Sequence, residues 1–302
     1  MTKYQSGAFI YNGDAGGEGQ LVEKLSQTVP ILSQDVEALT VVQTNSKEDL
    51  MEKCERYGKE VEVLYILGGD GTMYDVINSI ADMDNRPVIG VLPGGTCNDF
   101  SRMLGMPQNL AQAAQAIVNG QEAPVDIGKS QKRYFLNFWG IGLVTATSLN
   151  INPNQKNRFG ALSYFLSAMK SMNDTNPFQY KITIDNEEVH EEQGVMVLVL
   201  NGSYIGTRMV PIPSLYVNDG KLDVLIVKSS TLKTFRELLS MNQPGTDIDK
   251  MQELTHLQAQ TIKIETEDDL EIDTDGEVER KTPDEISVLP NHIRMIFHQD
   301  KV

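Results

Sequence analysis

The first third of the chain alternates short apolar runs with segments of helical periodicity, and this alternation constrains the fold more than any other feature. The apolar runs predict strands over residues 8–11, 39–43, 61–67 and 87–92. The segments between them predict helices over 19–28, 46–57, 72–81 and 96–104. Strands and helices in alternation are typical of βαβ units around a parallel sheet. We therefore expect an α/β fold whose N-terminal domain is an open, mostly parallel sheet.

Each predicted strand leads directly into a loop of small or polar residues. The loops are NGDAGG at 12–17, Thr44 with Asn45, GGDGT at 68–72 and GGTCND at 94–99. In an open α/β sheet such loops meet at the carboxyl ends of the strands, where ligands bind. Loops of this kind on one edge predict a single binding crevice.

After a further predicted helix at 110–119, the pattern changes to strand-like segments separated by turn signals. These segments lie at 134–139, 179–184, 195–200, 221–227, 256–265 and 286–289, with helices expected at 159–172 and 231–241. They predict a second, mostly antiparallel β domain. We place the two domains at 1–123 and 124–290, and we expect 291–302 to return to the first.

Length indicates the number of domains, and net charge bears on whether the protein binds nucleic acid. The 302 residues suggest two domains of about 150 residues each. Asp and Glu number 42 against 26 Lys and Arg, giving a net charge of −16, whereas binding to nucleic acid phosphates requires a basic surface. We therefore expect no nucleic acid partner.

Cysteine number and hydropathy indicate the cellular location of the protein. Two cysteines cannot form a disulfide framework, and the four histidines show no metal-binding spacing. The first ten residues lack the apolar core of a secretory signal, and no apolar run reaches the roughly 18 residues that span a bilayer. We expect a cytoplasmic protein without a transmembrane anchor, which would meet a lipid peripherally, at the membrane surface.

The most informative loop is Gly68-Gly69-Asp70-Gly71-Thr72, between an apolar strand and a helix. Its glycines would let the backbone approach a phosphate, and N–H groups at the helix start could bind it. Asp70 is negative, like a phosphate, so it suits a nucleotide hydroxyl, a base edge or magnesium through water. Alternatively, the pentapeptide is only a tight turn with an aspartate cap. It is neither a P-loop nor a complete dinucleotide fingerprint.

The second loop, PGGTCNDFSR at 93–102, could simply cap a helix through Thr96 or Asn98. Together, however, GGDGT and GTCNDF-x-R resemble the paired signature of the diacylglycerol kinase catalytic domain family, which includes sphingosine and ceramide kinases and many bacterial lipid kinases. Further segments are similar to motifs of that family: 12–16, VDIG at 125–128, RFGALSYF at 158–165, NDGKLD at 218–223 and DGE at 275–277.

This resemblance implies ATP-dependent transfer of a γ-phosphoryl group to a lipid hydroxyl, with ATP between the two domains. Diacylglycerol, giving phosphatidic acid, is the expected acceptor. Asp70 is expected to be catalytic as well as to bind nucleotide. By motif match, the nucleotide-binding residues are Asn12, Gly13, Asp14, Ala15, Gly16, Thr44, Gly68, Gly69, Asp70, Gly71, Thr72 and Thr96.

The resemblance also implies that Glu277 is the general base and that Mg²⁺ in the β domain binds the Asp219 side chain with the carbonyls of Tyr216 and Lys221. Phosphoryl transfer needs positioned phosphates, a metal that offsets charge and a carboxylate that takes the acceptor's proton. Taken alone, Asp-Gly at 275–276 and Asn-Asp-Gly at 218–220 are hairpin and turn signals. A hairpin can carry a base at its tip, so both interpretations can hold.

Several residues depart from the family pattern. Tyr74 and Asp75 stand where an Asn-Glu pair is usual, which puts nucleotide geometry or partner preference in question. Gly13 replaces a proline and should loosen the first loop, and Gly17 replaces a basic residue that could contact phosphate. Cys97 is either a small filler beside the helix start or a redox switch.

Alternatives remain open for function and surface. NAD kinases share GGDGT, and a non-catalytic nucleotide sensor could keep this fold. The basic residues at 129–133 lie near aromatic residues and could face a bilayer, or could be solvated charge beside a core. The acidic stretch 265–285 is a solvated hairpin or an interaction tail. Edge strands in the β domain would allow a homodimer.

Overall fold

The computed structural model describes residues 2–13, 18–145, 176–241, 243, 246 and 250–301. The chain forms two compact units: unit 1 contains Met1–Val125 and Asn291–Val302, and unit 2 contains Asp126–Pro290. Strands β5 (Gln121–Ser130) and β18 (Asp284–Phe297) each run from one unit into the other. The C-terminal segment therefore belongs to the same unit as the N-terminus.

Unit 1 is the parallel α/β sheet that the alternating pattern predicts. Its strands lie in the order β2-β1-β3-β4-β18, and each neighbouring pair is parallel. The first four are β1 (Tyr4–Asn12), β2 (Val36–Thr44), β3 (Val63–Gly68) and β4 (Val88–Pro93). The helices are α1 (Glu18–Leu32), α2 (Lys47–Glu60), α3 (Asp70–Ile80), α4 (Asp99–Met103) and α5 (Leu110–Asn119), followed at the C-terminus by a 3₁₀ turn, Gln299–Lys301.

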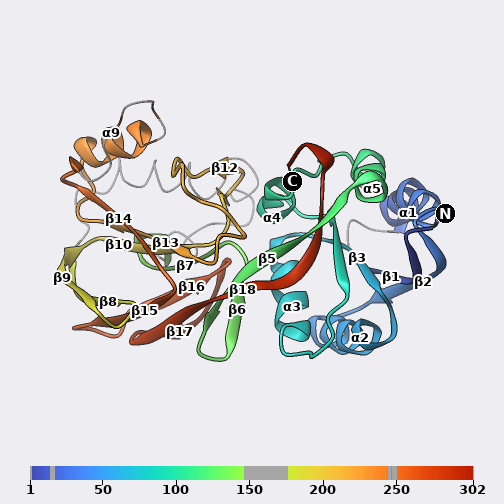
Figure 1. Cartoon of the computed structure of the whole chain (residues 1–302), viewed down its shortest axis with the longest axis horizontal. Coiled ribbons are helices and arrows are strands. Elements are labelled where there is room, and N and C mark those ends of the chain that lie inside the picture. Colours follow the sequence, from blue (N-terminus) through green and yellow to red (C-terminus); the bar gives the residue numbers. More distant parts are fainter. Residues whose placement is uncertain are drawn as a thin grey trace. The chain divides into compact units, whose positions relative to one another are not determined.

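The central strands are apolar along their length because both faces of the sheet are covered. The side chains of β4 are buried throughout, as are those of β3 up to its last residue. Helix α1 packs against α5 and α2 packs against α3, and Figure 1 shows these pairs on opposite faces of the sheet. Ser46 caps α2 by accepting a hydrogen bond from the Asp49 N–H at 3.1 Å, as its sequence predicts.

The described part of unit 2 contains two larger antiparallel arrangements of strands and the two-stranded β11–β12 hairpin. One has the order β14-β13-β10-β7-β16-β17, and the other joins β18, β15, β8 and β9. The fold class is therefore confirmed. The strands are β6 (Arg133–Phe135), β7 (Phe138–Gly142), β8 (Phe178–Ile184), β9 (Glu188–Gly194), β10 (Met196–Leu200), β11 (Tyr204–Ile205), β12 (Arg208–Met209), β13 (Leu222–Val227), β14 (Leu254–Ala259), β15 (Thr261–Thr266), β16 (Glu271–Thr274) and β17 (Glu277–Lys281). Helix α9 (Leu232–Ser240) lies outside the sheets.

The six-stranded sheet buries both of its faces. One face shares a core with the second sheet, where Trp139 and Val199 meet Ile182 and Ile262. The opposite face packs Leu198 and other side chains against α9 and the β11–β12 hairpin. Burial on both faces explains the uninterrupted apolar runs MVLVL in β10 and LIV in β13.

Some expected elements differ from the observed ones. The segment predicted as one strand at 134–139 is two strands, β6 and β7, because residues 136–137 turn away to hydrogen-bond other segments. The segment at 256–265 likewise divides at Gln260 into β14 and β15, which belong to different sheets. The helix expected from Thr96 begins only at Asp99. The helix expected at 159–172 lies outside the described residues.

Candidate active site

The GGDGT loop joins β3 to α3. Strand β3 ends at Gly68 and α3 begins at Asp70, so Gly71 and Thr72 lie in the first helical turn. The first hydrogen bond of the helix runs from the Met73 N–H to the Gly69 carbonyl at 3.0 Å. N–H groups in the turn before that bond lie outside the helical ladder and carry the positive end of the helix dipole, an arrangement that suits a phosphate.

The two glycine loops contact each other directly, backbone to backbone. The Gly94 N–H donates to the Gly68 carbonyl at 2.8 Å. A Cβ added to Gly95 would lie 2.6 Å from the Gly69 Cα, and one added to Gly94 would lie 2.9 Å from the Gly68 Cα. Any side chain at these positions would separate the loops. The glycines therefore hold the two loops together, in addition to leaving room for a ligand.

Asp70 links the same two loops through its side chain. Its Oδ1 accepts a hydrogen bond from the Phe100 N–H at 3.2 Å, in the first turn of α4. Burial raises the pKa of the Asp70 carboxyl, and backbone N–H groups at residues 98–100 act in the opposite direction. The structure thus shows a role for Asp70 that the sequence did not indicate: it stabilises the second loop from the first.

Asn98 closes the second loop. Its backbone is left-handed, with φ of 53°, and its side chain makes no capping bond to α4. Instead, its Oδ1 accepts from the Gly95 N–H at 2.8 Å and its Nδ2 donates to the Gly95 carbonyl at 2.9 Å. Thr96 is exposed at the tip of this closed loop, and Cys97 is half-buried beside it.

A pocket of about 130 Å³ in unit 1 brings together expected nucleotide residues from three different segments, namely Asn12, Thr44 and Thr72. It also exposes Lys47 and Asp75, which form an ion pair at 2.9 Å. Lys47 at the start of α2 was not singled out in the sequence, although its place directly after the β2 loop could have suggested it. The pocket has the polar lining that a nucleotide sugar or base requires.

The departures from the family pattern acquire a structural explanation here. Tyr74 is buried in unit 1 rather than facing a ligand, and Asp75 pairs with Lys47. The Gly13 N–H donates to the Thr44 carbonyl at 2.9 Å, a bond that a proline could not make. The expected loosening by Gly13 is therefore offset by this bond. Asp14, Ala15, Gly16 and Gly17 lie outside the described residues.

In unit 2 the DGE motif forms the turn between β16 and β17. Asp275 and Gly276 both have positive φ, 53° and 94°, and Glu277 is the first residue of β17. The buried Asp275 carboxylate accepts three backbone N–H groups, from Leu136 at 2.7 Å, Asn137 at 2.9 Å and Phe138 at 2.8 Å. Glu277 is half-buried and is the first residue of β17. The turn just before it is held in place by the buried Asp275 carboxylate.

The acidic stretch 265–285 is therefore a hairpin, but several of its acids are not solvated. Asp273, Asp275 and Asp284 are buried. Asp273 accepts the Gly276 N–H at 2.7 Å, and Asp284 accepts from the Trp139 indole N–H at 2.8 Å. These carboxylates organise the hairpin through hydrogen bonds, which the acidic composition alone did not reveal.

The turn expected to hold Mg²⁺ is also built by carboxylates. Asp219 Oδ1 accepts the Lys221 N–H at 3.0 Å, and the Gly220 N–H donates to Asp126 at 2.7 Å. Burial raises the pKa of Asp219, and negative charge on Asp223 and Asp126 raises it further. Excess negative charge beside carbonyl oxygens is compatible with Mg²⁺. Among the described residues, no three His, Cys, Asp or Glu side chains form a metal cluster.

The basic segment 129–133 does not present aromatic residues to a bilayer. Tyr134, Phe135 and Trp139 are all buried, and the Lys129 ammonium lies 5.5 Å from the Tyr134 ring centroid. The described residues of this segment fit the interpretation as charge beside core aromatics, and docking on a bilayer stays a prediction. Within the described parts of the chain, no helix is both long enough and apolar enough to cross a membrane.

Comparison with known proteins identifies both units. Residues 6–130 match the diacylglycerol kinase catalytic domain, and residues 142–297 match the YegS C-terminal NAD kinase beta sandwich-like domain. The fold and the paired loops thus define a two-domain kinase. The chain belongs to the diacylglycerol kinase catalytic domain family, with a YegS-type second domain.

Individual relatives extend over the whole chain. A crystal structure titled a diacylglycerol kinase from Bacillus anthracis strain Sterne is 38% identical, with a TM-score of 0.87 and 100% coverage of both chains. A second crystal structure from that strain, whose title gives the same activity provisionally, is 37% identical with a TM-score of 0.90 and the same coverage. A Staphylococcus aureus strain N315 protein with a provisional lipid kinase name is 29% identical over 99% of both chains.

An NAD kinase from Archaeoglobus fulgidus, solved in complex with ATP, is 12% identical with a TM-score of 0.50 and covers 98% of this chain and 94% of its own. At this identity the likeness shows a shared fold alone. The two domain matches and the Bacillus anthracis structures confirm the expected family, and the kinase class follows from that family.

Proposed function

We propose that this protein is an ATP-dependent lipid kinase that phosphorylates a lipid hydroxyl, with diacylglycerol as the first acceptor to test and phosphatidic acid as its product. The observation that carries the proposal is that one chain contains both features: two glycine loops in unit 1 that hydrogen-bond to each other, and a DGE turn in unit 2 that is held by buried hydrogen bonds. The family of the chain supports a lipid acceptor.

The proposed roles follow from the chemistry of each group. N–H groups of the 68–72 loop, together with Thr96, bind the ATP phosphates, and Asn12, Thr44 and Thr72 line the adjoining pocket. The acceptor oxygen attacks the γ-phosphorus as the bond to the β-phosphate oxygen breaks, and ADP leaves. Glu277 takes the proton of the acceptor hydroxyl. Mg²⁺, held by Asp219 with the carbonyls of Tyr216 and Lys221, would offset negative charge.

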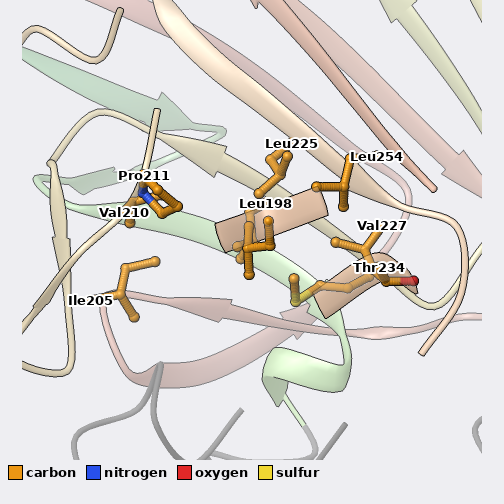
Figure 2. A pocket seen from close by; sticks show the side chains of 10 residues that line it. Leu198, Ile205, Val210, Pro211, Leu225, Val227, Thr234 and Leu254 are labelled. Carbon is orange, nitrogen blue, oxygen red and sulfur yellow. The ribbon is translucent and has the colours of Figure 1, made fainter. Parts of the chain in front are cut away.

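An apolar pocket in unit 2 supports a lipid as the acceptor. Figure 2 shows Leu198, Leu225 and Leu254 around it, with Ile205 and Val210 from the hairpin region on one side and Thr234 of α9 on the other. Its free volume is only about 10 Å³, enough for roughly one water molecule. A hydrocarbon chain would enter only if part of the wall moved, and α9 is the helical part of that wall.

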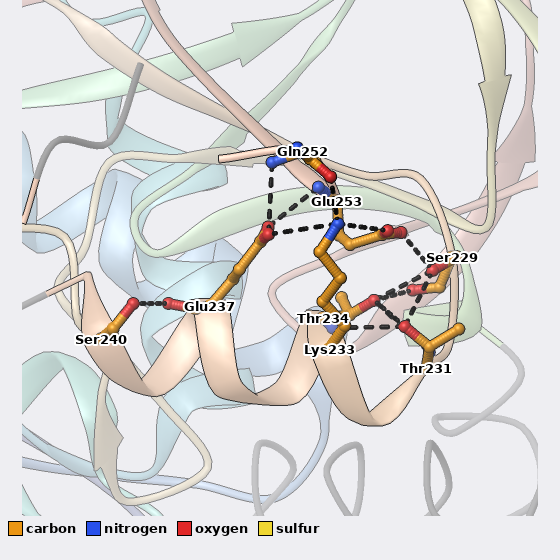
Figure 3. A network of polar contacts seen from close by, with 8 residues as sticks. All are labelled: Ser229, Thr231, Lys233, Thr234, Glu237, Ser240, Gln252 and Glu253. Atoms are coloured by element: carbon orange, nitrogen blue, oxygen red, sulfur yellow. Dashed lines mark hydrogen bonds and ion pairs between the residues drawn. The ribbon is translucent and has the colours of Figure 1, made fainter. Parts of the chain in front are cut away.

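Polar contacts hold α9 in place along one side, as Figure 3 shows. The Glu237 carboxylate accepts the N–H groups of Gln252 at 3.2 Å and Glu253 at 2.8 Å. At the N-terminus, Thr231 and Thr234 form a reciprocal cap, and Lys233 pairs with Glu253 at 3.2 Å. These contacts can exchange with water, so α9 can separate from the apolar wall more readily than a strand can.

The test of catalysis is a transfer assay with labelled ATP over dispersed lipids and NAD. We expect phosphorylation of a lipid, with turnover abolished in Glu277→Gln while nucleotide affinity is kept, and with both lost in Asp70→Ala. Glu279→Gln is the matched control: Glu279 lies two residues further along β17 and pairs with Arg133 at 3.0 Å. Full activity of Glu277→Gln would contradict the assignment of the base.

The same assay separates the alternatives. Formation of NADP with no lipid product would support an NAD kinase activity instead, and ATP binding without turnover on any acceptor would support a nucleotide sensor. For the apolar pocket, Leu238→Phe should raise the KM for long-chain lipid and leave the KM for ATP unchanged. Arg236→Gln, at an exposed position of the same helix, is its control.

A further inference from the structure

Residues 136–138, which lead from the end of β6 into the first residue of β7, are held from two sides within unit 2. On one side, all three of its N–H groups donate to the Asp275 carboxylate of the DGE turn. The Phe138 carbonyl in turn accepts the Asp275 N–H at 3.0 Å. The position of this segment therefore determines where the turn before Glu277 lies.

On the other side, the same segment is held by Asn201, directly after β10. The Asn201 and Gly202 N–H groups both donate to the Asn137 carbonyl at 2.9 Å. The side-chain Nδ2 of Asn201 donates to the Leu136 carbonyl at 2.8 Å. Asn201 is 1% exposed, so these bonds are shielded from competing water.

The amide group of Asn201 has a second hydrogen, which it donates to the Asp126 carbonyl at 2.9 Å. Asp126 holds the turn assigned to Mg²⁺: its N–H donates to the Val217 carbonyl at 2.7 Å, and its carboxylate accepts the Gly220 N–H at 2.7 Å. One NH₂ group thus connects the segment that anchors the DGE turn with the residue that anchors the 216–221 turn.

The atoms around Asn201 are closely packed. Among the described residues, the Oδ1 atoms of Asn137 and Asn201 are buried without a hydrogen-bond partner. A Cβ at Gly202 would lie 2.5 Å from the Asn137 Oδ1, so residue 202 must be glycine for this packing. Buried unpaired oxygens oppose folding.

We propose that Asn201 is a positioning residue for Glu277, acting through residues 136–138 and Asp275. The inference deepens the proposed function and rests on it, because it concerns the geometry of the same general base. Asn201 touches neither nucleotide nor acceptor in this scheme. It holds the DGE turn in the position from which the Glu277 carboxylate reaches the acceptor hydroxyl.

The primary test is Asn201→Asp, which keeps the size of the side chain and removes both N–H donors. Outer-shell substitutions of this kind at metal sites reduce activity by roughly 10–100-fold, and we expect a similar fall in kcat. The KM for ATP should stay within about two-fold, because the nucleotide residues are in unit 1. The acid limb of the pH profile of kcat/KM, which reports the base, should also shift.

Asn201→Ser is a second variant that stays informative if the aspartate prevents folding. Its hydroxyl has one hydrogen and can hold only one of the two carbonyls, so its kcat should be lower than that of the wild type. Ser130→Ala is the matched control for lost stability. Ser130 is buried in the same unit, but it bonds to Asp284 and Arg280. We expect a lower melting temperature for Ser130→Ala with an unchanged kcat and pH profile.

Amide hydrogen exchange follows the structural link without relying on activity. Exchange at residues 136–138 and at Gly276 should accelerate in Asn201→Asp and not in Ser130→Ala. If exchange accelerates while kcat and the pH profile stay at wild-type values, Asn201 does not position the base and the proposal is wrong. Failure of the proposed function is a separate result, shown by an active Glu277→Gln in which Asn201 is intact.

Discussion

Asp70 has a structural role in the glycine loops and, in the proposed function, a catalytic role as well. Its carboxylate bonds to the start of α4, so it supports the second loop before any nucleotide binds. The family resemblance implies a second role for Asp70, in catalysis and nucleotide binding, and this role stays a prediction. A residue with both duties cannot be tested by alanine alone, because Asp70→Ala removes the brace and the charge together.

Asp70→Asn separates the two duties through pH. Burial raises the folded-state pKa of Asp70 above its ordinary value of 3.8, so the native state binds this proton more tightly than the unfolded state. Stability should therefore fall as pH rises from 3.8 through the folded pKa, and the loss persists at neutral pH. The asparagine keeps an oxygen for the Phe100 N–H and has no proton to lose.

Urea unfolding between pH 4 and 7 measures this effect. We expect Asp70→Asn to gain stability relative to the wild type as pH rises across the titration of Asp70, with turnover lost throughout. A stability difference that does not change with pH would contradict the raised pKa.

Gly95→Ala tests the contact between the loops. Its Cβ would lie 2.6 Å from the Gly69 Cα, and backbone atoms cannot rotate away as a side chain can. We expect a loss of about 1–3 kcal/mol in the free energy of unfolding and weaker ATP binding. Gly58→Ala, inside α2, is the control, since its Cβ would meet side chains rather than backbone: the flexible end of Met83 at 3.2 Å and Ile80 at 3.6 Å. It should be neutral or stabilising, by about 0.5–1 kcal/mol.

At the scale of elements, the hairpin β16–β17 depends on a carboxylate that it inserts into its own unit. Asp275→Asn would replace one acceptor oxygen by a donor facing backbone N–H groups. A buried N–H without a partner destabilises by roughly 1–3 kcal/mol, so we expect a loss in this range or above it, measured by urea unfolding. Asp185 provides the comparison, because it accepts the N–H groups of Gln260 and Thr261 at an exposed turn.

The Asp185→Asn variant should lose less than about 1 kcal/mol, since the asparagine Oδ1 can accept both N–H groups, its NH₂ group can face water, and asparagine tolerates the left-handed backbone that Asp185 adopts. Equal losses for Asp185→Asn and Asp275→Asn would show that burial of the Asp275 carboxylate is not what stabilises the hairpin.

At the scale of the whole molecule, the net charge of −16 opposes the proposed meeting with a membrane. Anionic headgroups repel a negative protein over about one Debye length, which is roughly 10 Å at 0.1 M salt. We expect turnover on diacylglycerol in anionic vesicles to rise with added salt, while turnover in neutral vesicles changes little. A fall with salt in anionic vesicles would point instead to a cationic docking surface.

The expected homodimer stays a prediction, and the charge of an exposed edge strand affects whether two copies can pair through it. Strand β9 is an edge of its sheet and carries Glu188, Glu191 and Glu192, and charge of one sign along an edge discourages strand-to-strand pairing. A dimer formed through β9 should therefore appear only at high salt. Sedimentation at low and high ionic strength measures this.

Local patterns in the sequence were sufficient for the parallel sheet of unit 1. Apolar runs followed by small residues place the loops at one sheet edge by topology alone, and the Ser46 cap of α2 involves residues three apart. Patterns over a few residues also showed the DGE and NDG turns, because such turns need positive φ at or beside glycine.

The tertiary structure decided what depends on contacts between distant residues. The bonds of Asp275 to residues 136–138, of Asn201 to Asp126 and of Asp70 to Phe100 join segments separated by about 30 to 140 positions. Residue type does not indicate which buried partner a carboxylate or an amide will find. The sequence alone therefore determined the class of fold and the candidate loops, whereas three-dimensional packing decided which polar side chains hold those loops, because hydrogen bonds form between neighbours in space.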